Sequence, residues 1–384
     1  MTRQLADFAT TDQNSLGRRY PEPPPNNRTQ FQRDRDRIVH SAAFRRLEYK
    51  TQVFVNHEGD MFRTRLTHSI EVAQIGRAIA NALSVNEDLT EAIALAHDLG
   101  HTPFGHAGQD ILNKCMSEYG GFEHNMQSLR IVDELEEKYA EFNGLNLSFE
   151  TREGILKHCS LANAKQLGKL GERFLNKQQP GVEAQITNIA DEIAYNSHDI
   201  DDGLRAGLLS IEQLREVAIF SEQYDQVAEA YPDIPQRRAI HEIIRRMINQ
   251  QVTDLLDTSM ALLQRLQPRS REEVLQHSEP VIQFSNTMRE QNLELKRFLR
   301  HNLYRHYRVH RMSSKAVNII RSLFDAFLND TELLPPEAQH NAMQFETKAG
   351  MSGRARAIAD YIAGMTDRYA IREYGKIFNP TELT

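Results

Sequence analysis

Apolar residues recur three or four positions apart along most of this 384-residue chain, the spacing that places one face of an α-helix against a core. Ile70, Val72, Ile75, Ile79 and Leu83 form one such stripe. Signals for β-strands are sparse, and an all-α fold is therefore predicted. Further helices are expected at 91–99, where Gly100 would close the helix, and at 183–204, 211–230, 236–266, 271–300 and 313–328.

A few segments interrupt the helical pattern. Residues 1–27 are polar and end in a proline-rich run, which is typical of an extended or turn segment. Gln52–Val55 is a candidate for a short strand or hairpin arm. Two stretches are predicted to be looser, 141–150 and 329–351; the second contains Pro335, Pro336 and Gly350 and is expected to be a loop.

The composition fits a soluble globular protein, with 40% hydrophobic and 26% charged residues. No apolar stretch approaches the ~20 residues that span a bilayer, and the first residues lack the apolar core of a signal peptide. Cys115 and Cys159 form no CxxC pair. We therefore expect a cytoplasmic protein without membrane contact, whose metal sites would use histidine and carboxylate ligands.

The net charge of −7 argues against a general nucleic-acid coat, although basic residues gather in two islands. Eight lysines and arginines and no acidic residue lie between Lys296 and Arg321, and a second island covers residues 28–50. Such islands suggest contacts with a polyanion. For any single residue, a solvated helix face that pairs with acidic neighbours is an equally good interpretation.

Residues 97–106, His-Asp-Leu-Gly-His-Thr-Pro-Phe-Gly-His, concentrate metal-binding chemistry. His97 and Asp98 offer a nitrogen and an oxygen donor side by side, which suits a borderline or hard divalent cation. Gly100 and Pro103 break the preceding helix, so that adjacent side chains can point into one site. The alternative, histidines that interact with a helix terminus, fits one histidine better than three.

The helix predicted at 183–204 has a polar face that is unusual for solvent. Asp191, Tyr195, His198 or Asp199, and Asp202 share this face, and isoleucines occupy the opposite one. This composition fits a helix that lines a metal-containing cleft. His68 stands at the start of another predicted helix, after a threonine that could cap it.

These motifs resemble the HD-domain metal-dependent phosphohydrolases, whose four-ligand pattern is similar to the order His68, His97-Asp98, Asp191. Six segments resemble the deoxyguanosine-triphosphate triphosphohydrolase-like subfamily more closely: Arg45–Leu47, Lys50–Phe54, Arg63–Ser69, His97–His106, Phe122–Asn125 and Asp360–Asp367. The resemblance runs from about residue 28 to the end. It implies an HD-domain helical fold with a helical C-terminal extension.

The resemblance also implies roles for individual residues. It assigns metal ligation to His68, His97, Asp98 and Asp191, with Mn, Mg, Co, Ni, Fe or Zn as the ion. It assigns chemistry near the α-phosphate to His106, with His101 and His124 as further active-site histidines. It assigns substrate contacts to Gln52 at the sugar 3′-hydroxyl, Arg65 at a phosphate, and Tyr195 and Asp199 around the deoxyribose; Arg46 is a further candidate clamp. Gln109 departs from the acidic residue of many relatives, since an amide can orient the catalytic histidine but cannot take its proton.

The implied reaction is hydrolysis of a dNTP at the α-phosphorus to a deoxynucleoside and tripolyphosphate. The implied organisation is an N-terminal arm over 1–27, an HD core over 28–210, and a helical region over 211–384 packed on the core as a single compact unit. Relatives form symmetric oligomers and some respond to a second dNTP, so that a homo-oligomer and an allosteric dNTP are expected. Single-stranded DNA on the basic islands is a further possible partner.

Two other functions stay open. A different HD-type enzyme, a 5′-nucleotidase or a phosphodiesterase, would need the same four ligands but not the segments Lys50–Gln52 and Asp360–Asp367. A catalytically weak regulator that binds nucleotide or single-stranded DNA is kept open by Gln109 and the basic islands. Against it, a non-catalytic binder has no need of four intact ligand positions.

Overall fold

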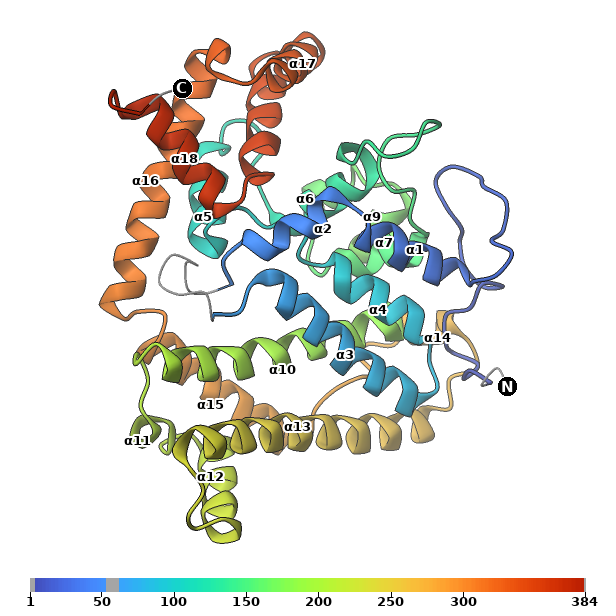
Figure 1. Ribbon diagram of the computed structural model, residues 1–384. Helices are drawn as coiled ribbons and strands as arrows, with labels where there is room; N and C mark the ends of the chain where they lie inside the picture. Colours follow the sequence, from blue (N-terminus) through green and yellow to red (C-terminus); the bar gives the residue numbers. More distant parts are fainter. Residues whose placement is uncertain (1–3, 53–61, 383–384) are drawn as a thin grey trace. The chain divides into compact units, whose positions relative to one another are not determined.

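The computed structural model describes residues 4–52 and 62–382, and helices dominate throughout (Figure 1). These described residues contain no β-strand; they include two isolated β-bridges, Arg18 with Ser148 and Thr51 with Thr64. The predicted all-α fold is therefore confirmed. Of the candidate strand Gln52–Val55, the last three residues lie outside the described residues. No helix in the described ranges has the length and apolar character needed to cross a membrane.

The chain forms two compact units, each assembled from three separate stretches of sequence. Unit 1 comprises Met1–Ile38, His68–Leu95 and Leu147–Tyr307, and unit 2 comprises Val39–Thr67, Ala96–Asn146 and Arg308–Thr384. The boundary between Thr67 and His68 falls inside helix α3 (Arg65–Leu83), so that Arg65 belongs to unit 2 and His68 to unit 1. The arm, core and C-terminal region expected from the sequence stay a prediction.

Unit 1 is built around two long helices, α10 (Val182–Arg205) and α13 (Gln236–Leu266), which pack side by side (Figure 1). Both also pack against neighbouring helices of the same unit. The other helices of unit 1 are α1 (Gln30–Val39), α3 (Arg65–Leu83, except its first turn), α4 (Glu87–Ala96), α7 (Phe149–Ile155), α8 (Leu161–Ala164), α9 (Lys169–Leu175), α11 (Ile211–Leu214), α12 (Ala218–Ala230), α14 (Arg271–Leu275) and α15 (Asn286–Asn302).

The N-terminal arm of unit 1 contains no helix over residues 4–27, as its proline-rich sequence predicts. Polar contacts fix it to the unit, and they reach carboxylates that are buried. The contacts are those of Thr10 N and Oγ1 with Glu183 (both 2.9 Å), Ser15 Oγ with Glu150 (2.6 Å) and Arg18 with Asp34 (2.6 Å). The arm is thus part of the folded unit.

Unit 2 has its core where α5 (Gly105–Cys115) meets three helices from the end of the chain. Buried members of this core include Phe104, Ile111, Ile320, Phe324 and Ile358. The other elements of unit 2 are α2 (Ala42–Arg46), η1 (Leu47–Tyr49), α6 (His124–Arg130), η3 (Ile131–Leu135), α16 (Tyr307–Asn329), η4 (Thr331–Leu333), α17 (Pro336–Ala363) and α18 (Asp367–Phe378).

The predicted loop at 329–351 is wrong, because most of it belongs to helix α17. Pro336 occupies the first helical turn, where proline is favoured since it lacks only a hydrogen bond that this turn does not make. Gly350 has φ +60° and, with Ala349, forms a kink within the helix. Proline and glycine here mark a helix start and a kink, and neither marks a loop.

Several predicted helix boundaries also differ from the structure. The helix predicted at 91–99 ends at Ala96, and His97–Gly100 form a turn. The predicted helices 211–230 and 271–300 are each two helices. Ile70, expected on the apolar stripe of α3, is 51% exposed, because it points away from the face that Val72, Ile75 and Ile79 share.

Candidate active site

The four predicted metal ligands fall into two pairs, one in each unit. His68 and Asp191 belong to unit 1, and His97 and Asp98 belong to unit 2. His68, His97 and Asp98 are buried, and all are donors of the kinds that hold divalent metals. Each pair has its own set of contacts within its unit.

In unit 1, helices α3 and α10 bring His68 and Asp191 together. Thr64 caps the start of α3 by accepting a hydrogen bond from Thr67 N at 3.4 Å, as the sequence predicts. His68 Nε2 lies 2.9 Å from Asp191 Oδ1. The other oxygen of Asp191 is paired with Lys157 Nζ. An imidazole nitrogen and a carboxylate oxygen therefore meet at hydrogen-bond distance.

Much of the polar face of α10 is buried, with Asp191 and Tyr195 half-buried, which supports its interpretation as a helix that lines a site rather than a solvent face. His198, Asp199 and Asp202 are all 4% exposed or less. His198 Nδ1 lies 3.3 Å from His68 Nδ1, and the ring of Tyr195 makes an edge contact with the ring of His68. The buried polar residues of α10 therefore lie next to the His68–Asp191 pair and contact it through His68.

Tyr304, in the turn that follows α15, contacts this face, and the sequence did not reveal this contact. Its hydroxyl donates to Asp199 Oδ2, and burial, together with the charge of Asp199, raises the pKa of Tyr304. The only signal in the sequence was an aromatic residue inside the basic island 296–321. Periodicity gives no reason to connect that position with Asp199, more than a hundred residues away.

In unit 2, Asp98 is the centre of a buried group of ionisable side chains. Its Oδ1 lies 3.2 Å from His97 Nε2 and 3.0 Å from His101 Nδ1, and its Oδ2 accepts from Arg65 Nη1 at 2.8 Å. Burial alone would raise the pKa of Asp98, but His97, His101 and Arg65 hold this pKa well below its ordinary value. The carboxylate of Asp98 is therefore ionised.

The predicted catalytic histidines of unit 2 lie close to one another. The ring centroids of His101 and His124 are 4.2 Å apart, and those of His101 and His106 are 6.0 Å apart. Burial, followed by the charge of Arg65, lowers the pKa of His101 well below its ordinary value, so that this ring is neutral. His106 is exposed in the first turn of α5, and Gln109 Oε1, one turn further on, is buried without a hydrogen-bond partner among the described residues.

The turn that carries these residues fits against the start of α6. A Cβ atom on Gly100 would lie 2.2 Å from Ser128 N and 2.3 Å from His124 O, so that only glycine fits. Gly100 N donates to Ser128 Oγ at 2.8 Å, and Ser128 Oγ donates to His97 O at 3.1 Å. Gly100 therefore permits a close approach, in addition to the helix break predicted from the sequence.

Gln52 and Lys50 approach the same turn from another segment of unit 2. Gln52 is buried, and its Oε1 finds no hydrogen-bond partner among the described residues. Lys50 is also buried, and its Nζ donates to His101 O at 2.5 Å and to Ala363 O at 2.8 Å. Burial, together with the charge of Arg46, lowers the pKa of Lys50 to about 7.

The depressed pKa of Lys50 predicts a pH dependence of stability. Between about pH 7 and the ordinary lysine pKa of 10.5, the unfolded chain binds a proton that the folded chain lacks. The free energy of unfolding should therefore rise with pH in this window, by up to about 1.4 kcal/mol per pH unit. Below pH 7, Lys50 is protonated in both the folded and the unfolded chain. Its contribution to the free energy of unfolding is then independent of pH and at its least favourable value.

Urea unfolding of the parent chain and of Lys50→Met at pH 7, 8 and 9 tests this expectation. The stability difference, parent minus variant, should increase with pH. Lys315→Met is the matched control at an exposed position of the same unit, and its difference from the parent should not change. Parallel pH profiles for parent and Lys50→Met would show that Lys50 is charged in the folded chain at pH 9.

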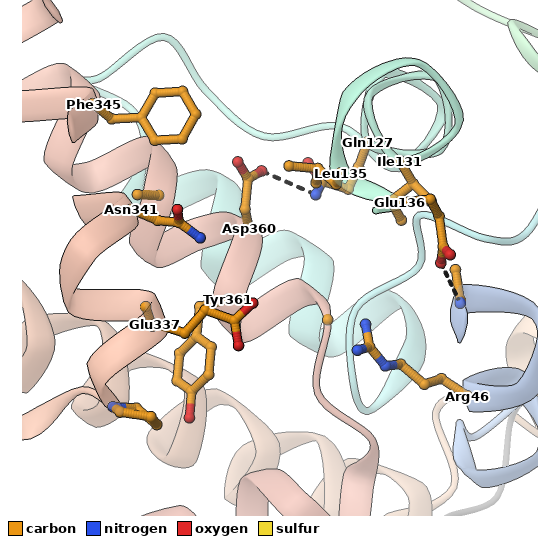
Figure 2. A pocket seen from close by; sticks show the side chains of 15 residues that line it. Arg46, Gln127, Ile131, Leu135, Glu136, Glu337, Asn341, Phe345, Asp360 and Tyr361 are labelled. Carbon is orange, nitrogen blue, oxygen red and sulfur yellow. Dashed lines mark hydrogen bonds between the residues drawn. The ribbon is translucent and has the colours of Figure 1, made fainter. Parts of the chain in front are cut away.

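Arg46 lines a pocket of about 290 Å³ in unit 2 (Figure 2). Asp360 and Tyr361 of α17 share this lining. Asp360 accepts from Gln127 Nε2 at 3.0 Å and from Arg130 Nε at 2.8 Å, and burial raises its pKa. Further carboxylates, Glu136 and Glu337, also line the pocket. Arg46 therefore faces mixed charge, and its role as a substrate clamp stays a prediction.

Some members of the basic islands are ion-paired within their own unit. Lys296 pairs with Glu192 at 2.7 Å, and Arg37 pairs with Glu22 at 2.6 Å. Arg28 and Arg35 both pair with Asp36. For these residues the interpretation as a helix face paired with acidic neighbours is correct.

Comparison with known proteins places these features in a family. The family model for the HD domain matches residues 65–196, and the model for the phosphohydrolase-associated domain matches residues 282–376. A deoxyguanosinetriphosphate triphosphohydrolase-like protein from Bordetella pertussis is 62% identical over 382 residues, which is 98% of this chain and 97% of that protein. Proteins of the same name from Nitrosomonas europaea and Thiobacillus denitrificans are 59% and 58% identical over 383 residues, covering 100% of both chains in each case. The matches support an HD-type phosphohydrolase.

Proposed function

Because the chain belongs to the deoxyguanosinetriphosphate triphosphohydrolase-like family, we propose that it is a metal-dependent dNTP triphosphohydrolase. It would hydrolyse a dNTP at the α-phosphorus and release the deoxynucleoside and intact tripolyphosphate. The observation that carries the proposal is the buried Asp98 carboxylate, which His97, His101 and Arg65 keep ionised. A buried and ionised acid beside imidazoles has a clear use as a metal ligand.

The residues present fit a divalent metal. We assign its ligands as His68, His97, Asp98 and Asp191, two imidazoles and two carboxylates, a set that suits several divalent ions. When bound, the ion lowers the pKa of a water molecule and polarises a phosphate oxygen. Burial of His68, His97 and Asp98 favours the ion further, because desolvated donors gain the most from a cation.

The remaining residues supply charge, a proton and sugar recognition. Arg65 provides a fixed guanidinium for the phosphates. His106, exposed at the start of α5, can hold the proton that the departing 5′-oxygen needs when the bond from that oxygen to the α-phosphorus breaks. Gln52 supports a nucleotide with an intact sugar 3′-hydroxyl, because its buried Oε1 can accept a hydrogen bond from that hydroxyl. In unit 1, Tyr195 and Asp199, with Tyr304, would surround the deoxyribose.

The purified chain with Mn²⁺, Mg²⁺ or Co²⁺ and each dNTP, alone and in mixtures, provides the test. We expect release of tripolyphosphate and deoxynucleoside in equal amounts, and loss of turnover on chelation. Mixtures are included because the family resemblance predicts activation by a second dNTP, and sizing of the active species would test the predicted homo-oligomer.

Failure to release tripolyphosphate under all these conditions would reject the proposal. Release of phosphate from a nucleoside monophosphate, or opening of a cyclic nucleotide, would instead favour a different HD-type enzyme. Binding of nucleotide or single-stranded DNA with no turnover would favour a regulator.

A further inference from the structure

Asp367, at the first position of α18, connects two segments of unit 2 that carry predicted site residues. Its Oδ1 accepts from Phe104 N at 2.9 Å, and its Oδ2 accepts from Thr51 N at 3.0 Å and from Thr51 Oγ1. Asp367 is 1% exposed. Phe104 stands two residues before His106, and Thr51 directly precedes Gln52.

The carboxylate of Asp367 is not needed to cap its own helix. Thr366 is the N-cap of α18, and its Oγ1 accepts from Tyr369 N at 3.2 Å. Both oxygens of Asp367 are therefore directed to other segments of the chain. An ionised carboxylate accepts several hydrogen bonds at once, which matches the three donors that it meets here.

Phe104 is held in a conformation that needs such support. Its φ is +63°, in the left-handed region that residues with a Cβ rarely adopt, and Gly105 follows with φ +58°. This pair of residues turns the chain from the His97–His101 segment into α5, where His106 lies in the first turn. The hydrogen bond from Phe104 N to Asp367 thus acts where the backbone turns toward His106.

Lys50 provides a second connection between the same segments. Its Nζ joins His101 O to Ala363 O, four residues before Asp367. The segment Ala363–Asp367 therefore reaches the histidine turn at His101 and at Phe104, and reaches the Gln52 segment through Lys50 and Thr51. A single short stretch of chain holds both site segments.

We propose that Asp367 is a positioning residue that fixes the predicted proton donor His106 and the predicted sugar contact Gln52 relative to each other within unit 2. This inference rests on the proposed dNTP hydrolysis for its catalytic consequence, whereas the hydrogen bonds on which it depends can be measured without substrate. It gives Asp367, whose two carboxylate oxygens accept hydrogen bonds from Phe104 and Thr51, a task in the proposed site.

Three substitutions separate the hydrogen bond of Asp367 with Phe104 from its hydrogen bonds with Thr51. Asp367→Ala removes both acceptors. Asp367→Asn keeps an acceptor for Phe104 N but replaces the oxygen that accepts from Thr51. Thr51→Val keeps the shape of the side chain and removes only its hydroxyl. Asp330→Asn is the matched control, because Asp330 caps η4 through Glu332 N, is exposed and makes no contact with either site segment.

The first measurement is hydrogen exchange without substrate. We expect Asp367→Ala to exchange faster over residues 101–107, with the helices of unit 1 unchanged. Thr51→Val should leave residues 101–107 as in the parent. Equal exchange over 101–107 in parent and Asp367→Ala would overturn the proposal, and so would faster exchange throughout the chain, which would indicate a purely structural role.

The second measurement compares a dNTP with its 2′,3′-dideoxy analogue. We expect Asp367→Ala to lower kcat for the dNTP by about 10- to 100-fold, the usual range for a residue that orients a catalytic group. The ratio of kcat/KM for the dNTP to kcat/KM for the analogue should decrease in all three variants, because each substitution disturbs the segment that carries Gln52. A loss of folded protein would lower both rates equally and leave this ratio unchanged, which would count against the proposal.

The two measurements also distinguish the failure of this inference from the failure of the proposed function. A parent chain without turnover rejects dNTP hydrolysis, and the exchange data still decide whether Asp367 holds residues 101–107. An active parent whose Asp367 variants match Asp330→Asn in exchange, kcat and sugar preference rejects the positioning role alone.

Discussion

Replacing Asp98 by asparagine is expected to remove the bound metal and to lower kcat/KM for a dNTP by about 10³-fold or more. A metal ion contributes several kcal/mol of transition-state stabilisation, and each 1.36 kcal/mol corresponds to a factor of ten. The amide keeps the size of Asp98 but loses the negative charge that His97, His101 and Arg65 hold in place. Calorimetric titration with Mn²⁺ and kinetics with tripolyphosphate detection are the measurements.

Asp110→Asn is the matched control for Asp98→Asn. Asp110 is exposed on α5, and its replacement should leave both Mn²⁺ affinity and turnover as in the parent. Parental Mn²⁺ affinity in Asp98→Asn would exclude Asp98 as a ligand.

The double substitution His97→Ala with Asp98→Ala tests the regulator hypothesis, since a regulator should retain nucleotide affinity after both donors of unit 2 are lost.

Replacing Gly100 by alanine is expected to lower the free energy of unfolding by about 3 kcal/mol and to remove turnover. The new Cβ atom would lie 2.2 Å from Ser128 N and 2.3 Å from His124 O. Both are backbone atoms and cannot rotate away, so that the turn must move, at the upper end of the usual overpacking cost. Urea unfolding and the release of tripolyphosphate from a dNTP measure the two effects.

Gly181→Ala is the control for Gly100→Ala. Gly181 has φ −55°, and no atom outside its chain neighbours would come closer than 3.7 Å to its new Cβ. Because Gly181 is the N-cap of α10, its replacement by alanine should lower the free energy of unfolding by about 1 kcal/mol or less. A Gly100→Ala chain as stable and as active as Gly181→Ala would mean that the turn has room to shift without disturbing His97 and Asp98.

Local patterns in the sequence predicted much of the helical structure. The helix expected at 236–266 has those bounds as α13, and 183–204 became α10 with one residue added at each end. These helices carry long amphipathic patterns, because one face of each helix packs against its neighbours. Helix α17 was missed because proline and glycine signal both loops and helix starts or kinks, and only the packing of unit 2 distinguishes these cases.

The donors of the candidate site were also predictable, since they stand in short runs. His97 and Asp98 are adjacent, and Asp191 and Asp199 share one helix face. The residues that hold them were not predictable. Tyr304 meets Asp199 across 105 positions and Asp367 meets Phe104 across 263, and no periodicity links residues at such separations. The sequence therefore indicates the residues that carry the chemistry better than it indicates the residues that hold them in place.

The interleaved composition of unit 2 sets an order of events during synthesis. Its core joins Phe104 and Ile111 to Ile320, Phe324 and Ile358, so that the middle segment leaves the ribosome long before its packing partners. Unit 1, by contrast, has all its residues once Tyr307 has been added. The hydrogen bonds from Lys50 Nζ to Ala363 O and from Phe104 N to Asp367 would form only after these late residues have been translated. Until then, the nascent chain would lack part of the proposed active site, and the apolar side chains of its middle segment would stay exposed, a condition that favours aggregation.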